Sequence, residues 1–143
     1  EELEQLLRPN TRMVAMLHGS NVCGTLLPAA EVGAFCAAHG LAAVCITAAA
    51  SIDLKAHEPG LLEFCRAHGW PVQFYSAAQL QNAPGQFTPS AFVRSVTGVD
   101  NVCERAAVLA AGGTIILPKQ AGGGVTFALA LRPFAPDWRW QDA

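Results

Sequence analysis

The sequence predicts an α/β domain whose mixed, mostly parallel five-stranded sheet is covered by helices on both faces and ends in an antiparallel hairpin. Short apolar runs alternate with segments of helical periodicity, an order typical of a parallel sheet covered by helices. Near the end of the chain a Gly-rich turn joins two apolar runs, which indicates the hairpin. With 143 residues, 52% of them apolar, the chain suits a single domain. We expect this domain to span residues 1–143, with a core over about residues 12–131 and a tail over residues 132–143.

Two helices and two strands are predicted in the first part of the chain. Leucines at helical spacing indicate a helix within residues 1–7, which Pro9 and Asn10 end. Residues 29–39 have the apolar spacing of a second helix, and Gly40 follows as a natural stop. The predicted strands are the apolar runs at residues 12–17 and 41–47, each followed by a loop, at residues 18–25 and 48–60.

The second part of the chain alternates in the same way. A helix is predicted at residues 58–68, where Pro59 is tolerated because it falls in the first turn. Ser90 suits the N-terminal cap of a short helix over residues 91–96. The other predicted segments are a strand (71–75), a helical turn (76–81), a loop (82–89), an Ala-rich helix (101–111), a strand (114–117), a turn (118–124) and a fifth strand (125–131).

Charge and composition argue against several classes of function. The net charge of -2 and the pI of about 6.1 come with no basic patch, so neither nucleic acid nor an anionic membrane surface is a predicted partner. No apolar run approaches the ~20 residues of a membrane span. The acidic start, EELEQLLRPN, lacks the basic and apolar regions of a signal peptide. We therefore expect a cytoplasmic protein.

The residues that commonly bind metals and cofactors are not arranged to do so. The five cysteines are odd in number and contain no C-x-x-C spacing, and the four histidines do not lie at metal-ligand spacings. The glycines of the loop at residues 18–25 do not match the nucleotide-binding patterns. We expect reduced thiols, several of them in the core, no metal site and no cofactor held by protein ligands.

The loop at residues 48–60 concentrates charge at the end of a strand, the place where ligands bind in open α/β sheets. Asp53, Lys55 and Glu58 lie within six positions, although only 14% of the residues are charged. In an extended segment Asp53 and Lys55 point the same way, and Glu58 is favoured at the start of a helix. An acid and a base held together can perform acid–base chemistry. The alternative is a helix-entry loop whose charges neutralise one another.

Three further places carry candidate residues, each with a structural alternative. The loop that ends in Gly24 and Thr25 can present backbone N–H groups to an anion, or can be a plain connection. Glu104, in an otherwise apolar helix, is either a buried functional carboxylate or a surface residue paired with a neighbouring arginine. Lys119 is either a cation at the mouth of a site or a solvated hairpin residue.

Three segments together resemble one family. They are ASIDLKAHEPGLLEF (50–64), PSAFVRSVTGVDNVCERAAVLAAGG (89–113) and LPKQAGGGVTFALA (117–130). In this order and spacing they are similar to the cobalamin-biosynthesis family of CobE and the C-terminal domain of CbiG, a likeness that covers residues 13–131. The first loop departs from the family's usual G-x-G-x-R-x-G-[ST]-x-x-E pattern, because it has no Arg and Glu31 is displaced, whereas Gly24 and Thr25 match.

The resemblance implies a three-layer α/β/α fold and a role in building the corrin ring. It implies that the ligand is a precorrin-type tetrapyrrole, whose carboxylates Lys55 and Lys119 would hold. Asp53 and Glu58 would orient the lysine, and with Lys55 they are the candidate catalytic residues. The candidate ligand-binding residues are Gly24, Thr25, Ser51, Lys55, Thr97, Gly98, Glu104 and Lys119.

The resemblance leaves three functions open. The chain binds or acts on a precorrin-type intermediate, as a stand-alone protein similar to the CobE form of the aerobic pathway. Alternatively, it is a hydrolase similar to the CbiG proteins of the anaerobic pathway, which open the δ-lactone of a cobalt-precorrin and release acetaldehyde. Glu58 or Asp53 would then be the base and Lys55 would stabilise the oxyanion. The third function is a non-catalytic scaffold for other pathway enzymes, with Trp138 and Trp140 as anchors.

Overall fold

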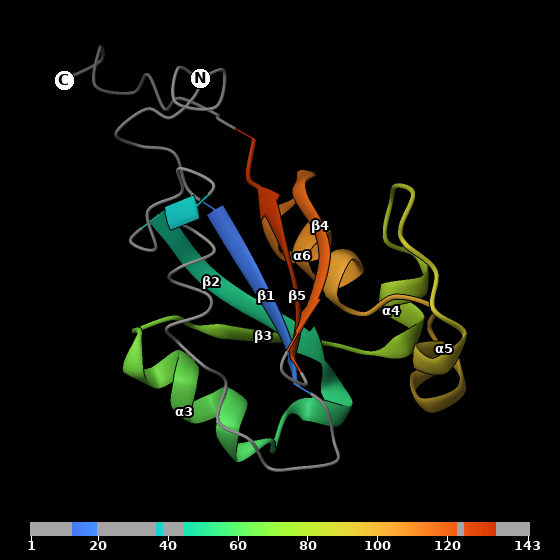
Figure 1. The fold of residues 1–143 in the computed structure, drawn as a ribbon, viewed down its shortest axis with the longest axis horizontal. Coiled ribbons are helices and arrows are strands. Elements are labelled where there is room, and N and C mark those ends of the chain that lie inside the picture. The colour runs from blue at the N-terminus through green and yellow to red at the C-terminus, as the bar shows by residue number, and fades with distance from the viewer. Residues whose placement is uncertain (1–12, 20–36, 39–44, 123–124, 134–143) are drawn as a thin grey trace, which may run out of the picture.

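The computed structural model describes residues 13–19 by their backbone and residues 37–38, 45–122 and 125–133 in full. Five strands form one sheet in the order β3-β2-β1-β5-β4 (Figure 1). The strands are β1 (Met13–Gly19), β2 (Ile46–Ile52), β3 (Val72–Tyr75), β4 (Thr114–Gly122) and β5 (Val125–Leu131).

The sheet contains as many parallel as antiparallel strand pairs. β2 pairs in parallel with β1 and with β3, whereas β5 pairs antiparallel with β1 and with β4. The predicted fold, a three-layer arrangement on a mostly parallel sheet, is therefore wrong in its balance of strand pairs, although the α/β class stands. The sequence predicts that the hairpin only ends the sheet. In the structure β5 is an inner strand that pairs with the whole of β1, from Met13 opposite Leu131 to Gly19 opposite Val125, so the hairpin supplies half of the strand pairs.

The hairpin is also longer than predicted. A turn was expected at residues 118–124, but β4 continues to Gly122. Its pairing with β5 shifts register between Ile115 and Leu117 and again between Leu117 and Gln120. The second irregularity contains Pro118, which cannot donate to a ladder and is tolerated at a bulge of an edge strand. The strand thus persists because the bulge accommodates the proline.

The starts and ends of several helices are marked by residues that are visible in the sequence. They are η2 (Asp53–Lys55, a 3-10 turn), α3 (Pro59–Ala67), α4 (Ala77–Gln81), α5 (Ala91–Thr97) and α6 (Cys103–Ala111). Pro59 begins α3, as predicted, and the Ser90 hydroxyl accepts from the N–H of Val93, which confirms the predicted cap. Gly98 and Gly112 end α5 and α6 in the left-handed conformation, with φ of 78° and 61°. Among the described residues, no helix is long and apolar enough to cross a membrane.

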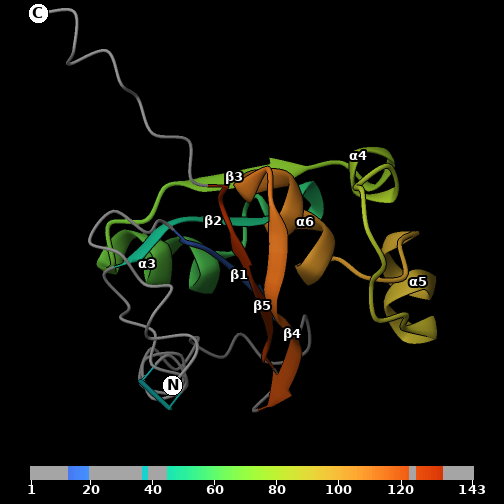
Figure 2. The ribbon, with the colours of Figure 1, turned by 90° about the horizontal axis from the view of Figure 1, so that it is seen from above.

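Each face of the sheet has its own apolar cluster. Side chains of α3 pack against one face, in a cluster that includes Leu61, Phe64, Cys65, Ala49 and Leu129. The other face is lined by alanines and packs against α6, whose own contacts are also mostly alanine; this cluster includes Ala48, Ala50, Ala106, Ala107, Ala128 and Ala130. Small side chains on both sides allow α6 to lie close to the strands. Figures 1 and 2 show α4 and α5 together at the end of the molecule opposite α3.

Candidate functional site

The carboxyl ends of four strands lie at one edge of the sheet. β4 is antiparallel to β5, and β5 to β1, so β4 runs in the same direction as β1, β2 and β3. The ends of these strands, Gly19, Ile52, Tyr75 and Gly122, define what we call the carboxyl edge. η2 follows β2 at this edge. α6 begins at the same edge, because its first turn bonds the backbone near the end of β4.

Lys55 and Glu58 form a buried ion pair just beyond the end of β2. The Lys55 ammonium lies 3.3 Å from a Glu58 carboxylate oxygen, and the two side chains are 4% and 28% exposed. Turns close the segment, because the N–H of Glu58 donates to the carbonyl of Lys55 and the N–H of Leu62 donates to that of Glu58. Burial of a lysine requires a counter-charge. Glu58 supplies that counter-charge from three residues away.

Asp53 and Lys55 do not share one direction. The segment forms the 3-10 turn η2 instead of an extended strand, so Asp53 is exposed while Lys55 is buried. The expectation that the two side chains point the same way is therefore wrong. Ser51, the last candidate residue before this turn, is completely buried, and its hydroxyl has no hydrogen-bond partner among the described residues.

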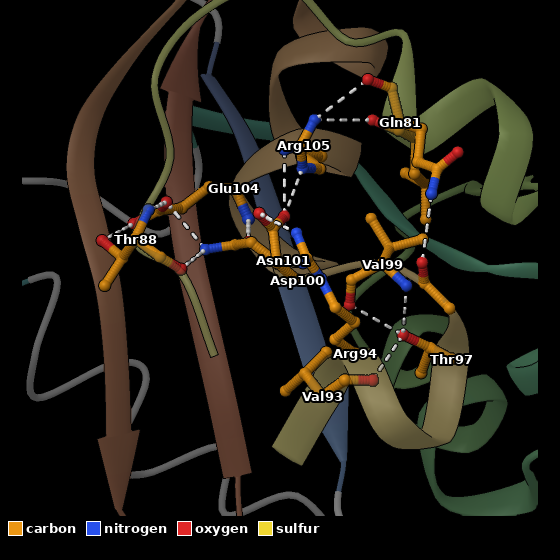
Figure 3. A network of polar contacts seen from close by, with 12 residues as sticks. Gln81, Thr88, Val93, Arg94, Thr97, Val99, Asp100, Asn101, Glu104 and Arg105 are labelled. Carbon is orange, nitrogen blue, oxygen red and sulfur yellow. Dashed lines mark hydrogen bonds and ion pairs between the residues drawn. The ribbon is translucent and has the colours of Figure 1, made fainter. Parts of the chain in front are cut away.

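Glu104 is the most densely bonded side chain at the carboxyl edge. It is 2% exposed, and its two oxygens accept four hydrogen bonds. Figure 3 shows those from Thr88 and Asn101. Oε1 accepts from the Thr88 hydroxyl at 3.0 Å and from the N–H of Lys119 at 2.6 Å. Oε2 accepts from the N–H of Thr88 at 2.7 Å and from Nδ2 of Asn101 at 2.8 Å. The position of Glu104 in the first turn of α6 further favours its negative charge.

Lys119 lies in the second bulge of β4. The bulge leaves residues 118–119 without ladder partners, and side chains bond the N–H of Lys119 and the carbonyl of Pro118 instead. The N–H of Lys119 donates to Glu104, and the carbonyl of Pro118 accepts from Nε2 of Gln120 at 3.0 Å. The Lys119 side chain is partly exposed.

Thr97 and Gly98 form the turn that ends α5. The Thr97 hydroxyl donates to the carbonyls of Val93 and Val99, and the carbonyl of Gly98 accepts from Nε2 of Gln81 (Figure 3). Their polar groups are thus used within the fold. Their role as ligand-binding residues stays a prediction.

Arg105 connects α6 with α4 and with the loop at residues 82–89. Its guanidinium forms an ion pair with Asp100 at 2.9 Å and donates to the carbonyls of Leu80 and Gln81. The same guanidinium lies 4.6 Å from the centre of the Phe87 ring. α4, α6 and the loop at residues 82–89 are joined through this one side chain.

Cys103 is a buried thiol at the start of α6. Its pKa is raised to about 12, mainly by burial and also by the neighbouring Glu104 charge, while the Lys119 charge opposes the rise. Burial also raises the pKa of Cys65, to about 11. Both thiols stay protonated at neutral pH and are packing residues. Among the described residues, no group of three or more His, Cys, Asp or Glu side chains is placed to hold a metal ion.

The structure joins the predicted residues in two groups. Lys55 contacts Glu58, and Glu104 contacts the backbone of Lys119. The groups are separated along the sheet by β1 and β5. The remaining candidates, Gly24, Thr25, Trp138 and Trp140, lie outside the described residues.

Thr88 and Asn101 are members of the site that the sequence reasoning missed. Asn101 had a visible signal, because an Asn three residues before a Glu at a helix start has the spacing of a capping box. Its Oδ1 indeed accepts from the N–H of Glu104 at 2.8 Å. Thr88 had no such signal, because it lies 16 positions from Glu104 in a loop.

The fold and its carboxyl edge define a class: an α/β domain with buried charged groups beyond the strand ends. Within that class, the chain belongs to the family described as cobalamin synthesis G C-terminus, whose model matches residues 27–130. The family predicted from the three sequence segments is therefore confirmed. The chain is a member of a cobalamin-biosynthesis family.

Two relatives and two solved structures are similar to this chain. Protein CobE of a Sinorhizobium species is 34% identical over 115 residues, which are 76% of this chain and 75% of CobE. A cobalt-precorrin-5A hydrolase of Priestia megaterium is 39% identical over 90 residues, which are 62% of this chain but 24% of the hydrolase. The chain thus spans about a quarter of that relative.

The crystal structure of CobE, a protein of the cobalamin pathway, matches with a TM-score of 0.77 and 28% identity, over 91% of this chain and 96% of CobE. The cobalamin biosynthesis protein ChiG of Agrobacterium tumefaciens matches with a TM-score of 0.62 and 23% identity, over 85% of this chain and 99% of ChiG. The ChiG match shows the likeness of the fold.

Proposed function

We propose that the protein binds a carboxylate-rich tetrapyrrole intermediate of corrin-ring synthesis at its carboxyl edge. The observation that carries the proposal is the position of the lysines. Lys55 and Lys119 are the only lysines of the chain, and both belong to this edge. In a member of a cobalamin-biosynthesis family, two cations at the carboxyl edge suit a ligand with several carboxylates.

The spacing of the lysines fits a large ligand. Lys55 follows β2 and Lys119 belongs to β4, so three strand spacings of ~4.8 Å separate them, roughly 14 Å across the sheet. A tetrapyrrole ring with carboxylate arms can span such a separation, whereas a single small acid cannot contact both cations. Partly exposed Lys119 is the more accessible contact, and the buried Lys55 is held by Glu58.

A fluorescence titration with uroporphyrin tests the proposal. Uroporphyrin is a stable, carboxylate-rich tetrapyrrole, and coproporphyrin carries fewer carboxylates on the same ring. We expect binding of uroporphyrin that weakens as salt is added and that exceeds the binding of coproporphyrin. Absence of binding to uroporphyrin, or equal binding of the two porphyrins, would contradict the proposal.

A matched pair of variants locates the binding. Lys119→Ala removes a cation at the carboxyl edge, and Arg132→Ala removes one that follows the end of β5 at the opposite edge. We expect Lys119→Ala to weaken uroporphyrin binding roughly tenfold, as the loss of one charge-assisted contact does. Arg132→Ala should bind as the wild-type protein does. An equal loss in both variants would show that net charge, and no particular edge, attracts the ligand.

A hydrolase is the second candidate function, because the Priestia megaterium relative is named a cobalt-precorrin-5A hydrolase. In this case Glu58 or exposed Asp53 would activate water and Lys55 would stabilise the developing negative charge. Incubation with cobalt-precorrin-5A separates the two functions. Release of acetaldehyde that Glu58→Gln abolishes would support hydrolysis, and binding without turnover would support binding alone.

A further inference from the structure

The bulge of β4 and Glu104 fit each other as donor and acceptor. Residue 119 lies in the bulge, where the pairing with β5 is interrupted, and its N–H donates to Oε1 of Glu104 at 2.6 Å. Bulges commonly redirect a side chain at a functional site. Lys119 is one of the two residues in this bulge.

Only a carboxylate can satisfy this arrangement. Four donors converge on Glu104, two on each oxygen, and no cationic side chain among the described residues forms an ion pair with it. A glutamine has one acceptor oxygen, so its NH₂ group would face two donors. Burial of an anion that only neutral groups contact lowers stability unless all its acceptor sites are used. The four hydrogen bonds therefore fix the position of the Glu104 carboxylate, and one of them connects it to the backbone of Lys119.

We propose that Glu104 is a positioning residue: its carboxylate fixes the β4 bulge in the conformation that presents the Lys119 ammonium to a carboxylate of the ligand. The inference rests on the proposed function, in which Lys119 contacts the tetrapyrrole. Thr88 and Asn101 hold the carboxylate from its other side, so that the loop at residues 82–89, the start of α6 and β4 form one fixed unit.

Glu104→Gln tests the inference, because charge and position have opposite effects on affinity. Loss of a negative charge by itself tightens the binding of a polyanion. A displaced Lys119 weakens it. We expect uroporphyrin affinity to fall roughly tenfold, as in Lys119→Ala. The double variant should bind no more weakly than Lys119→Ala alone, because the two changes remove the same contact.

Asp100→Asn is the matched control. It is also an acid-to-amide change near the start of α6, and it also removes stability, through the ion pair with Arg105, but it leaves the bulge untouched. We expect its uroporphyrin affinity to equal or exceed that of the wild-type protein. A loss of affinity in Asp100→Asn as large as in Glu104→Gln would overturn the inference, since general destabilisation would then explain both.

Amide hydrogen exchange measures, without any ligand, whether the N–H of Lys119 stays hydrogen-bonded in the bulge. The N–H of Lys119 should exchange slowly in the wild-type protein and in Asp100→Asn, and rapidly in Glu104→Gln. Equal protection in all three proteins would overturn the positioning role. Absence of uroporphyrin binding by the wild-type protein would overturn the proposed function and the ligand contact of Lys119, while the exchange rates would still decide whether Glu104 holds the bulge.

Discussion

Glu104 and Lys55 are both buried charges at the carboxyl edge, but the protein stabilises them in opposite ways. Lys55 has an opposite charge three residues away, within its own turn. Glu104 has neutral donors from three separate segments, 15 and 16 positions away for the two most distant. The first charge is held locally, and the second is held only once the whole domain has assembled. The difference indicates that the Lys55–Glu58 pair can be replaced by two uncharged side chains together. Glu104 cannot be replaced in this way, because its partners belong to distant segments.

Glu104→Ala should have the largest effect on stability. It leaves the N–H groups of Thr88 and Lys119 and the amide of Asn101 without their acceptor in a buried place. We expect the free energy of unfolding to fall by about 4 kcal/mol, measured by urea denaturation. A fall no larger than that of an exposed substitution would show that water replaces the carboxylate and that the centre is not structural.

Lys55→Met should cost less, about 2 kcal/mol, because the Glu58 left behind is partly exposed and can be hydrated. The double variant Lys55→Met, Glu58→Gln should recover part of that loss, since a local pair can be replaced together. Urea denaturation of the two single variants and the double variant measures this coupling. Strictly additive losses would contradict the contrast with Glu104.

Asn101 and Ser51 offer a smaller contrast between two buried polar side chains. Asn101 is bonded on both ends of its amide, whereas the hydroxyl of Ser51 has no partner in the part of the chain that the structure describes. Asn101→Ala should lower the free energy of unfolding by about 2 kcal/mol, whereas Ser51→Ala should leave it unchanged or raise it slightly. A clear loss in Ser51→Ala would reveal that water or a ligand uses this hydroxyl.

At neutral pH the smallest effect is that of the Cys103 ionisation, because it changes stability only at alkaline pH. The pKa of Cys103 is raised from 9.0 to about 12, so the native state keeps the thiol proton that the unfolded state releases. This contribution to stability is complete below pH 9 and is lost as the pH rises from 9 through 12. Cys103→Ala should therefore lose stability less steeply over that range than the wild-type protein, in urea denaturation at a series of pH values. Identical slopes would contradict the assignment.

The same contrast explains what the sequence could predict. The Lys55–Glu58 segment, the Ser90 cap and the first-turn position of Pro59 depend on neighbours a few residues away, and each is visible in the sequence. The bonds of Glu104 to Thr88 and to Lys119, and the insertion of β5 beside β1, depend on which distant segments pack together. Local patterns do not encode that packing. The sequence therefore identified Glu104 and Lys119 as candidates but did not reveal that one bonds the other.

The central claim, that the carboxyl edge is where the protein binds a carboxylate-rich tetrapyrrole, is tested most directly by mapping backbone amide NMR shifts during a titration with uroporphyrin. We expect the shifted amides to gather at residues 53–58 and 119–122, and the amides of residues 69–72 and 112–114 at the opposite edge to keep their shifts. Shifts concentrated at that opposite edge, or spread evenly over the protein surface, would contradict it.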